Sequence, residues 1–486
     1  MRRKQLQISI TLREGATIGR QIADAIRDAI RAGRLAAGET LPSSRDLASQ
    51  LGVGRNSVLD AITLLSDEGY VVTIPAVGTS VAAAGQPPPQ LQATPLEDVK
   101  LSDWASQLPV LDMSARRAGC QFDLRPGLPD LRLIPFDEWR LSAARKLKTL
   151  RSMIGPYGDP QGDAELRAQI AQYVARSRGI AGNGDNVIVT SGAQQAFDLI
   201  ARVLIAPGQK VAVEDPGYLP AILTFKAAGA ALCPVTVGRE GLEVAEIPDG
   251  TAIAYVTPSH QYPLAGTMTI QRRRELLSWA NCHRAFIIED DYDSEYNYSR
   301  ERLPALKASD AMGRVIYVGT FSKNLMPGIR LGYLIVPAEL RDVLVRARWL
   351  SDRHSDTTSQ SVLAEFMSSG LFSRHIVKMA AIYRERHAML HGFTDALADA
   401  GAELLPSSAG LHSCILLSPH ENEDQLIQAA EAADLGLYGL RQNYLGQPEA
   451  AGLILGFGNA SVDTIEVALT RLVDLLNKRT IARNSH

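Results

Sequence analysis

The chain has 486 residues, more than one hydrophobic core usually supports, so at least two domains are expected. With 46% hydrophobic and 21% charged residues it has the composition of a soluble globular protein, and no run of roughly 18 apolar residues predicts a membrane span. The net charge of −3 argues against polyanion binding by the whole surface, although one domain can still present a basic face.

Two further features predict a cytoplasmic protein. The first residues, MRRKQLQISITL, are basic but lack the continuous apolar core of a signal peptide. The cysteines lie far apart and form no CxxC pair, which predicts neither a disulfide framework nor a zinc site. They are Cys120, Cys233, Cys282 and Cys414. No metal site is therefore expected.

Residues 10–83 are predicted to form a first domain of short helices and a strand pair. Apolar residues at steps of three and four mark the buried face of a first helix. These residues are Ile18, Ile22, Ala25, Ile26 and Ala29. A short second helix comes after Pro42, with either Ser43 or Ser44 as its N-cap, and Gly52 ends it.

A third helix is predicted from about residue 55 to residue 66. Two short helices joined by a glycine-containing turn form a helix-turn-helix. The segments 70–73 and 79–81, separated by a turn that contains Pro75 and Gly78, are typical of a two-stranded wing. The expected first domain is therefore an α+β winged helix-turn-helix.

The segment from Gly38 to Val58 follows the pattern GxxLPSSRxLAxxLGVxRNSV and closely resembles the winged helix of GntR-type transcription regulators. The resemblance implies that the third helix enters the major groove of double-stranded operator DNA. Arginine can pair bidentately with guanine, and short hydroxyl and amide side chains hold phosphates or base edges. The matching positions, with the wing tip last, are Arg45, Arg55, Asn56, Ser57 and Gly78.

The charge of residues 1–84 leaves a second interpretation of this domain open. The segment holds ten Lys or Arg and eight Asp or Glu, a net charge of only about +2. The alternative is a winged helix that contacts protein rather than DNA. Arg45 and Arg55 flank the turn where DNA would lie, and a weak overall field suits a protein that dimerises to bind tightly.

Residues 84–119 are predicted to be a linker, because three consecutive prolines at 87–89 favour an extended, semi-rigid conformation. Within residues 120–486, short apolar strands alternate with helical stretches, the pattern of a parallel α/β sheet. We therefore expect a multidomain chain whose second domain is α/β with a mainly parallel sheet.

Several predicted strands of this second domain end in polar or aromatic groups. The segment 190–195 opens a helix after one strand, and backbone N–H groups at such a helix start form a phosphate site. Tyr218 and the segments 257–263 and 289–292 follow three further strands. Another strand leads into Gly319-Thr320-Phe321-Ser322-Lys323, and Arg330 follows the lysine after seven residues.

A lysine at a strand end with such an arginine resembles the Schiff-base motif of fold-type I pyridoxal-phosphate enzymes. Together with the winged helix, the chain through about residue 480 is similar to MocR-type regulators, a GntR branch with an aminotransferase-like domain. The resemblance implies that pyridoxal 5'-phosphate is bound through a Schiff base to Lys323. It also implies a homodimer, because Tyr157 in GPYGDPQG resembles the tyrosine that reaches across to the partner subunit's phosphate.

The same resemblance implies roles for other residues. Asp290, with Asp291 as its rival, would pair with the protonated pyridine nitrogen. Tyr292 would hydrogen-bond the phenolic oxygen, and Tyr218 would stack on the ring. The phosphate would be held by the backbone of Ala193 and Gln194 and by Thr320, Ser322 and Arg330. His260 is either a residue that faces the ligand or a structural histidine that supports the pocket.

Two positions depart from the family pattern. Ala265 stands where relatives usually place a glycine after Pro-x, so the local turn is expected to differ. Ile454 stands where aminotransferases place the arginine that clamps the substrate carboxylate. The missing arginine weakens the interpretation as an enzyme, and Arg441 is a candidate to supply the charge instead.

The preferred hypothesis is a transcription regulator that senses an amine-bearing effector, or pyridoxal phosphate itself, through its second domain. Ligand binding would then change the relative placement of two winged helices. The alternative is a catalytically active aminotransferase with an attached DNA-binding module, which would produce a keto acid.

Overall fold

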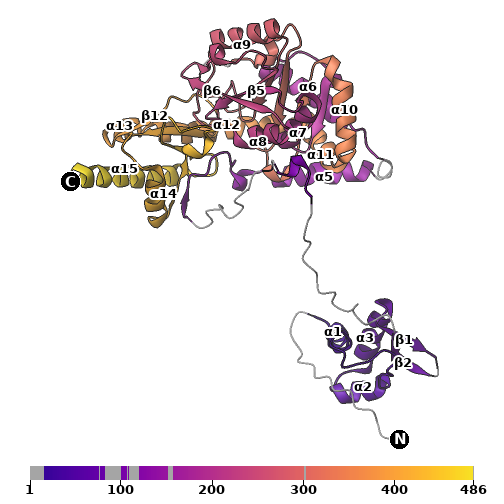
Figure 1. Ribbon diagram of the computed structural model, residues 1–486. Helices are drawn as coiled ribbons and strands as arrows, with labels where there is room; N and C mark the ends of the chain where they lie inside the picture. The colour runs from indigo at the N-terminus through magenta and orange to yellow at the C-terminus, as the bar shows by residue number, and fades with distance from the viewer. Residues whose placement is uncertain are drawn as a thin grey trace. The chain divides into compact units, whose positions relative to one another are not determined.

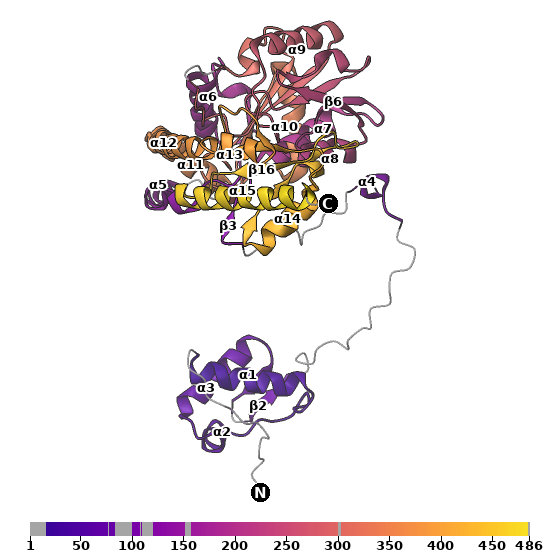
Figure 2. The same cartoon turned by 90° about the vertical axis from the view of Figure 1, so that its left-hand side faces the viewer.

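The structure, a computed structural model, describes residues 16–75, 77–82, 100–106, 108, 120–150, 157–299 and 303–484. The chain divides between Lys100 and Leu101 into two compact units (Figures 1 and 2). The predicted domains 10–83 and 120–486 lie on either side of this division, and most of the predicted linker 84–119 falls outside the described residues.

The described residues of the first unit form three helices and a two-stranded antiparallel sheet (Figure 1). Its elements are α1 (Ile18–Arg31), α2 (Ser44–Leu51), α3 (Arg55–Asp67), β1 (Val71–Ile74) and β2 (Gly78–Val81). In the wing, Val71 pairs with Val81 and Ile74 pairs with Gly78. The predicted helix-turn-helix and wing are confirmed.

Local chemistry explains where these helices begin and end. Ser43 is the N-cap of α2, because its hydroxyl accepts a hydrogen bond from the Asp46 backbone N–H at 3.2 Å. Gly52 ends α2 in the left-handed conformation, with φ of 65°, which glycine adopts without steric penalty. Ile18, predicted on the buried face of α1, is 39% exposed because it stands at the first position of the helix.

The second unit contains a large sheet with the strand order β4-β11-β10-β9-β8-β5-β6-β7. The strands are β4 (Val187–Thr190), β5 (Lys210–Asp215), β6 (Ala231–Gly238), β7 (Gly241–Leu242), β8 (Ile253–Val256), β9 (Phe286–Asp291), β10 (Val315–Thr320) and β11 (Gly332–Ile335). The ladder from β6 through β5, β8 and β9 to β10 is parallel, whereas β11 is antiparallel to β10 and β4, and β7 to β6. The prediction of a mainly parallel sheet is confirmed.

Helices cover both faces of this sheet. They include α6 (Ala164–Arg178), α7 (Ala193–Leu204), α8 (Leu219–Ala227), α9 (Ile270–His283), α10 (Ala338–Asp352) and α11 (Thr357–Ser368), while α5 (Phe136–Leu150) packs on α11. Residues of α7, α8 and α10 share a core with Ile288 and Val318. Residues of α6, α9 and α11 pack on the opposite face, which carries Ile287 and Tyr317. Successive side chains of a strand point to opposite faces of the sheet. Because helices cover both faces, both faces must be apolar.

A smaller antiparallel sheet, ordered β12-β13-β16-β15, forms the C-terminal part of the second unit. Its elements and their neighbours are α12 (Leu371–His391), α13 (Thr394–Asp399), β12 (Ala402–Leu404), β13 (His412–Leu417), α14 (Glu423–Ala432), β15 (Tyr438–Gly439), β16 (Gly452–Gly456) and α15 (Val462–Asn484). The strands β3 (Phe122–Asp123) and β14 (Leu435–Gly436) pair in parallel beside it. The sheet shares a core with α12 and α15, which contribute Tyr383 and Leu469.

The described part of the predicted linker contains a short helix, α4 (Asp103–Ser106). Its Trp104 and the nearby Leu108 line an open cavity of about 1330 Å³ together with residues of α7 and α8. These residues belong to the second compact unit, which begins at Leu101.

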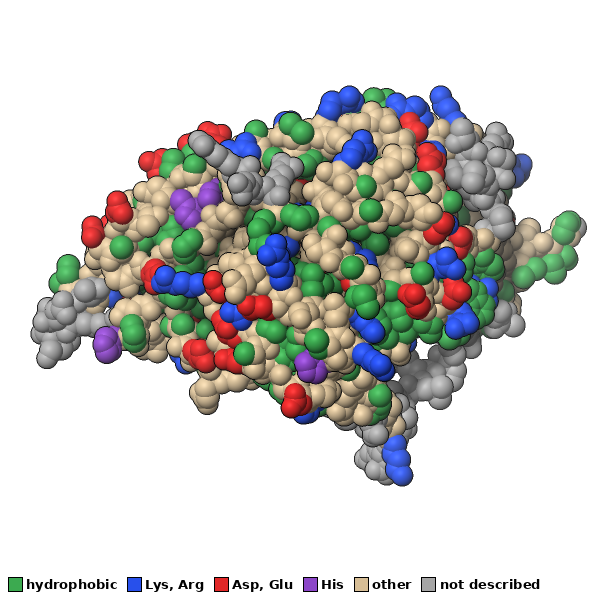
Figure 3. All heavy atoms as spheres, turned by 90° about the horizontal axis from the view of Figure 1, so that it is seen from above, with side chains coloured by type: hydrophobic (Ala, Val, Ile, Leu, Met, Phe, Trp, Pro, Cys, Tyr) green, Lys and Arg blue, Asp and Glu red, His purple; other side chains and the backbone are tan. Residues whose placement is uncertain are grey.

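The surface carries charges of both signs. On the face shown in Figure 3, acidic and basic side chains lie interspersed among hydrophobic ones, in keeping with the small net charge of −3. Among the described residues, no helix combines the length and the apolar character needed to cross a membrane.

Candidate functional site

The predicted site residues lie where the parallel strands end. The carboxyl ends of neighbouring parallel strands meet at one edge of a sheet, where α/β proteins bind ligands. Asp290 is near the end of β9, and Lys323 follows the end of β10, the strand paired with β9. Asp290 is close enough to Lys323 and to Tyr218 to act electrostatically on both.

Asp290 and Asp291 point to opposite faces of the sheet. Asp290 accepts a hydrogen bond from the Tyr255 hydroxyl at 2.7 Å, whereas Asp291 accepts one from the Tyr317 hydroxyl at 2.5 Å. Asp291 also forms a buried ion pair with Arg178 of α6, at 2.7 Å. Because Asp291 already has a cationic partner, Asp290 is the carboxylate left for a ligand.

No cation is paired with Asp290 in the described part of the chain, although the residue is only 4% exposed. Burial raises the pKa of Asp290 to about 7, and the neighbouring carboxylates of Asp291, Glu214 and Asp293 add to this effect against the hydrogen bond from Tyr255. A buried carboxyl in this state is set to pair with a positively charged ligand group.

Lys323 lies within electrostatic reach of this carboxyl, and its amine is held by the backbone. Its Nζ donates a hydrogen bond to the Gly127 carbonyl at 2.6 Å. Burial lowers the pKa of the Lys323 amine, although Asp293 and Asp290 act in the opposite direction. A lowered pKa increases the fraction of neutral amine, the form that attacks carbonyl carbon.

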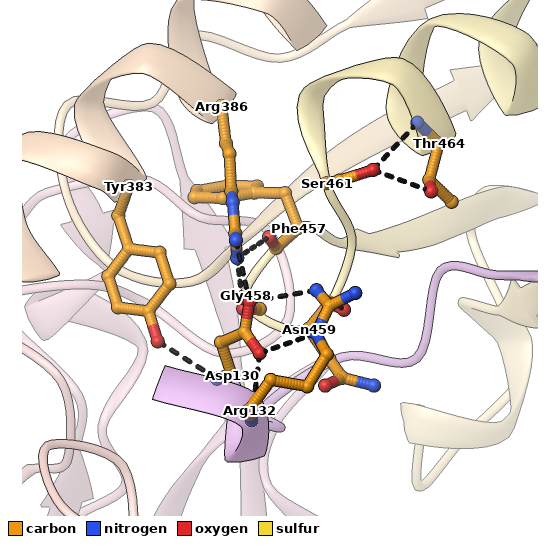
Figure 4. Close-up of polar contacts among 9 residues, drawn as sticks. All are labelled: Asp130, Arg132, Tyr383, Arg386, Phe457, Gly458, Asn459, Ser461 and Thr464. Carbon is orange, nitrogen blue, oxygen red and sulfur yellow. Dashed lines mark hydrogen bonds and ion pairs between the residues drawn. The ribbon is translucent and has the colours of Figure 1, made fainter. Parts of the chain in front are cut away.

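The segment that carries Gly127 is anchored by the polar network of Figure 4. The buried Asp130 carboxylate accepts hydrogen bonds from Arg386 of α12 at 2.6 Å and from Arg132 at 2.8 Å. Arg386 also donates to the carbonyl of Gly458 at 2.5 Å. The network thus ties the segment before α5 to α12 and to the end of β16, and so positions the carbonyl that holds Lys323.

Arg330 and the start of α7 form a cationic cradle. The Arg330 guanidinium donates a hydrogen bond to the Ser191 carbonyl at 2.9 Å. Gly192, the N-cap of α7, has φ of 88°, and a Cβ there would lie 3.1 Å from the guanidinium. Glycine is therefore needed for the arginine to approach the helix N-terminus, whose free N–H groups attract anions. Ala193 is the first residue of α7.

The remaining predicted phosphate residues surround this cradle. Thr320 ends β10, and its hydroxyl accepts a hydrogen bond from the Ser322 backbone N–H at 3.2 Å. The Gln194 side chain points to α8, where it donates to the Thr224 hydroxyl at 2.6 Å, which leaves its backbone as the part at the helix start. Arg330 and Gln194 also line the 1330 Å³ cavity, so the cradle is accessible.

Aromatic residues complete the pocket. Tyr218 is the N-cap of α8 and lies edge-on to Tyr262, with ring centroids 5.4 Å apart. The Tyr292 hydroxyl donates to the His260 carbonyl at 2.9 Å, and His260 itself is 2% exposed and bonded to Asp293. His260 is therefore buried and tied to its neighbours, as the structural interpretation of this residue predicts.

Four other predicted positions have clear locations. Ala265 adopts φ of 63°, so the alanine takes the left-handed conformation that a glycine would take. Ile454 is fully buried in β16, opposite Cys414 of β13. Arg441 is exposed and lines a separate cavity with Glu403 and other residues of the smaller sheet, so it does not join the residues around Lys323. Tyr157 is 75% exposed.

Most of the predicted DNA-contacting residues lie in the first turns of α2 and α3, and the last lies in the wing. Arg55, Asn56 and Ser57 form the first turn of α3, and Arg55 and Asn56 are exposed. Exposed Arg45 lies in the first turn of α2, and the Arg55 Nε donates to the Ser44 hydroxyl at 3.3 Å. Gly78 is exposed at the start of β2. This arrangement matches the way in which a helix-turn-helix presents its second helix to the major groove.

Sequence reasoning missed several residues that build the site. They are Gly127, Arg178, Tyr255, Asp293 and His412. Tyr255 carried a usable signal, since it lies at the end of a strand next to β9. Asp293 directly follows Tyr292 and was overlooked beside it, whereas Gly127, Arg178 and His412 come from segments far away in the sequence, where no motif marks them.

The donor set fits pyridoxal phosphate. Lys323 offers an amine for its aldehyde, and Asp290 offers a buried carboxyl without a cation for its pyridine nitrogen. Arg330 and the N-terminus of α7 offer an anion site for its phosphate. The three groups follow or end neighbouring strands of the large sheet.

Comparison with known proteins gives the same assignment for both units. The chain matches the family "Aminotransferase class I and II" over residues 127–450 and "Bacterial regulatory proteins, gntR family" over residues 18–81. It is 31% identical to the probable rhizopine catabolism regulatory protein MocR of Rhizobium meliloti over 463 residues, which cover 93% of this chain and 92% of that protein. It is 31% identical to the HTH-type pyridoxine biosynthesis transcriptional regulator PdxR of Corynebacterium glutamicum over 477 residues, which cover 97% of this chain and 99% of that protein.

The fold is also similar to that of a solved aminotransferase. A kynurenine aminotransferase of Pyrococcus horikoshii, crystallised in complex with PMP, has a TM-score of 0.72 and 24% sequence identity, covering 78% of this chain and 97% of that one. The regulators match the chain across both units, in the same order. The chain therefore belongs to the MocR-type transcription regulators, in which a GntR-type DNA-binding domain precedes an aminotransferase class I and II domain whose cofactor is pyridoxal phosphate.

Proposed function

We propose that the second unit of this regulator senses an amine-bearing effector, or pyridoxal phosphate itself, at Lys323, and that binding changes the affinity of the first unit for DNA. Bound pyridoxal phosphate supplies an aldehyde that reacts with amines and a ring that withdraws electrons. The observation that carries the proposal is the buried carboxyl of Asp290, which has no cation paired with it among the described residues and acts electrostatically on the amine of Lys323.

Each site residue has a role in this proposal. The Lys323 amine binds the cofactor aldehyde, Asp290 keeps the pyridine nitrogen protonated, and Tyr218 stacks on the ring. Tyr292 turns its hydroxyl from the His260 carbonyl to the phenolic oxygen. The residues that hold the phosphate are Arg330, Thr320, Ser322 and the backbone of Ala193 and Gln194.

Sensing is favoured over transamination by the side chain at position 454. Ile454 places a buried aliphatic group in β16 where an enzyme of this fold would hold a substrate carboxylate with an arginine. Exposed Arg441 lines another cavity and does not replace that arginine. An amine can therefore reach Lys323 without the clamp that orients an amino acid for turnover.

The regulator would act as a cytoplasmic homodimer. Tyr157 is 75% exposed and packs edge-on to His354, with Arg353 over its ring at 4.6 Å. An exposed aromatic held in this way is suited to reach the phosphate bound by the partner subunit. Two winged helices would read direct or inverted half-sites spaced by whole helical turns, with Arg45, Arg55, Asn56, Ser57 and Gly78 at the DNA.

Replacing Gly192 with alanine should weaken the binding of pyridoxal phosphate at least about tenfold, because the new Cβ would lie 3.1 Å from the Arg330 guanidinium and displace it from the helix start. Fluorescence titration of cofactor-free protein measures this affinity. Gly208→Ala is a matched control, since Gly208 has a similar φ of 80° but open space around it. Equal losses in both variants would contradict the assignment of the cradle.

The proposal predicts that cofactor chemistry and DNA affinity change together. Wild-type protein with pyridoxal phosphate should show a visible absorbance band that borohydride removes, and Lys323→Ala should lack this band. Adding an amine should shift both the band and the midpoint of binding to a labelled DNA duplex from upstream of the gene for this chain. In Lys323→Ala, the amine should leave the midpoint unchanged.

Arg55→Ala separates the two units in this experiment. It should lower DNA affinity by about 1–3 kcal/mol while the absorbance band stays intact, because the residue lies in the first unit. A wild-type band that responds to amines with no change in DNA binding, together with keto-acid production, would instead support the aminotransferase alternative.

A further inference from the structure

A buried cluster of two histidines and an aspartate lies beside the Lys323 site. His260 follows β8, Asp293 follows β9, and His412 begins β13, so the cluster joins the large sheet to the smaller one. The side chains of His260 and Asp293 are 1% and 2% exposed, and His412 is fully buried. One ligand atom from each residue can be chosen so that all three lie within 4.8 Å of one another.

The cluster contains polar atoms that lack partners among the described residues. The His260 Nδ1 lies 3.0 Å and 3.1 Å from the two Asp293 carboxylate oxygens, but its Nε2 has no hydrogen-bond partner. Neither ring nitrogen of His412 has a partner in hydrogen-bonding geometry, although the two imidazole centroids are only 4.3 Å apart. Each unpaired buried group costs about 1–3 kcal/mol, so the cluster favours an additional ligand.

The surroundings hold these side chains in place. The Leu411 backbone N–H donates to one Asp293 oxygen at 3.0 Å, which orients the carboxylate. Gly410, with φ of 80°, lets the chain pass so close that a Cβ there would lie 1.9 Å from the His260 Nδ1. The donors are therefore oriented by neighbouring groups before any ligand binds, as the supporting groups of metal sites orient their ligands.

We propose that His260, Asp293 and His412 form a binding site for a divalent transition-metal ion of the zinc class. Two imidazole nitrogens and one carboxylate oxygen are a ligand set that such ions prefer. Ligands of a tetrahedral zinc ion lie roughly 3.3 Å apart, given bonds of about 2.0 Å. The His260 Nδ1 and an Asp293 oxygen, 3.0 Å apart, are already close to that spacing, so the ion would replace the hydrogen bond between them, and an unpaired His412 nitrogen would be the third ligand.

A bound ion would have a structural effect beyond binding the unpaired nitrogen atoms. His412 belongs to the smaller sheet, whereas the other two ligands follow strands of the large sheet. An ion held by all three would link the two sheets close to Tyr292, whose hydroxyl lies 3.1 Å from the His260 Nδ1. Metal binding to the folded state alone raises its stability.

Cobalt provides a direct test, because Co²⁺ bound to nitrogen and oxygen ligands absorbs visible light. Full-length protein, freed of metal with a chelator, is titrated with Co²⁺ and then with Zn²⁺, and bound metal is counted by mass spectrometry. We expect one ion per chain, displacement of the cobalt spectrum by zinc, and a higher unfolding temperature with zinc. His412→Gln and Asp293→Asn should each lower the affinity for the ion at least about tenfold.

A second histidine pair in the same unit gives a matched control. The His387 and His391 rings are 4.1 Å apart, but their Nε2 atoms bond to the Ser407 carbonyl and the Ser413 hydroxyl. His391→Gln should therefore bind cobalt like the wild type. The proposal is overturned if wild-type protein binds no stoichiometric cobalt, as expected if water fills the cluster, or if folded Asp293→Asn retains full affinity. The wild-type titration shows whether the protein binds one ion per chain even if His412→Gln does not fold.

Discussion

Asp291→Asn should destabilise the second unit by about 3–5 kcal/mol, whereas the same change at the adjacent Asp290 should stabilise the cofactor-free protein at pH 8. Asp291 neutralises the Arg178 guanidinium, which is only 6% exposed. Asparagine there would leave a buried positive charge without its counter-charge. Asp290 has no such partner, and asparagine can still accept the hydrogen bond from Tyr255.

The pH dependence of the Asp290 effect follows from its raised pKa. In the folded protein this pKa is about 7, against an ordinary 3.8, so the folded state holds a proton that the unfolded state has lost between these values. Wild-type stability therefore falls as the pH rises from about 4 to about 7, and Asp290→Asn removes this loss. The difference between the two pKa values limits the increase in the free energy of unfolding of Asp290→Asn at pH 8 to about 4 kcal/mol.

Urea unfolding followed by tryptophan fluorescence measures both effects. All four tryptophans, at positions 104, 139, 279 and 349, belong to the second unit, so the signal does not report on the winged helix. Saturating pyridoxal phosphate should stabilise the wild type but have little effect on Asp290→Asn, because the pairing with the ring nitrogen is lost. A destabilised Asp290→Asn protein at pH 8, or an unaffected Asp291→Asn protein, would show that the two carboxylates have been assigned the wrong way round.

Asp130→Asn should lower the free energy of unfolding by about 3–5 kcal/mol, because it leaves the buried guanidinium of Arg386 without a counter-charge (Figure 4). Burial by itself would raise the pKa of Asp130, but hydrogen bonds from Arg132 and Arg386 outweigh it and hold the pKa below its ordinary value. The stabilising effect of the carboxylate is therefore full above the ordinary pKa near 3.8 and is lost as the pH falls through the lowered value.

The Asp130 experiment has an internal comparison and a second readout. Asp137→Asn breaks an ion pair with Arg140 in which both side chains are largely exposed, so little change in urea unfolding is expected. Because Asp130 anchors the segment that carries Gly127, its replacement should also weaken cofactor binding at Lys323. Equal stability of Asp130→Asn and Asp137→Asn at pH 7 would contradict the role given to the network.

The sequence by itself determined the two-part architecture and predicted the segments that carry the candidate cofactor site. The helix-turn-helix depends on local features, such as the break at Gly52 and the periodic apolar residues of α1 and α3, and local sequence controls these directly. The site motifs also follow a single rule, since polar residues after parallel strands must meet at one sheet edge. The roles of Lys323, Asp290 and Arg330 were implied by the resemblance to fold-type I pyridoxal-phosphate enzymes, and the sequence left Asp291 as a rival to Asp290.

Only the tertiary structure decided which of two adjacent aspartates forms an ion pair and which remains without a cation. Asp290 and Asp291 are adjacent in sequence, and the choice between them depended on Arg178, which comes from α6 on one face of the sheet. The same holds for the cluster of His260, Asp293 and His412, which sequence spacing did not reveal. Such contacts join segments that are distant along the chain, so they exist only once helices and sheets have packed, whereas a motif within one strand and its following turn is set by local backbone geometry.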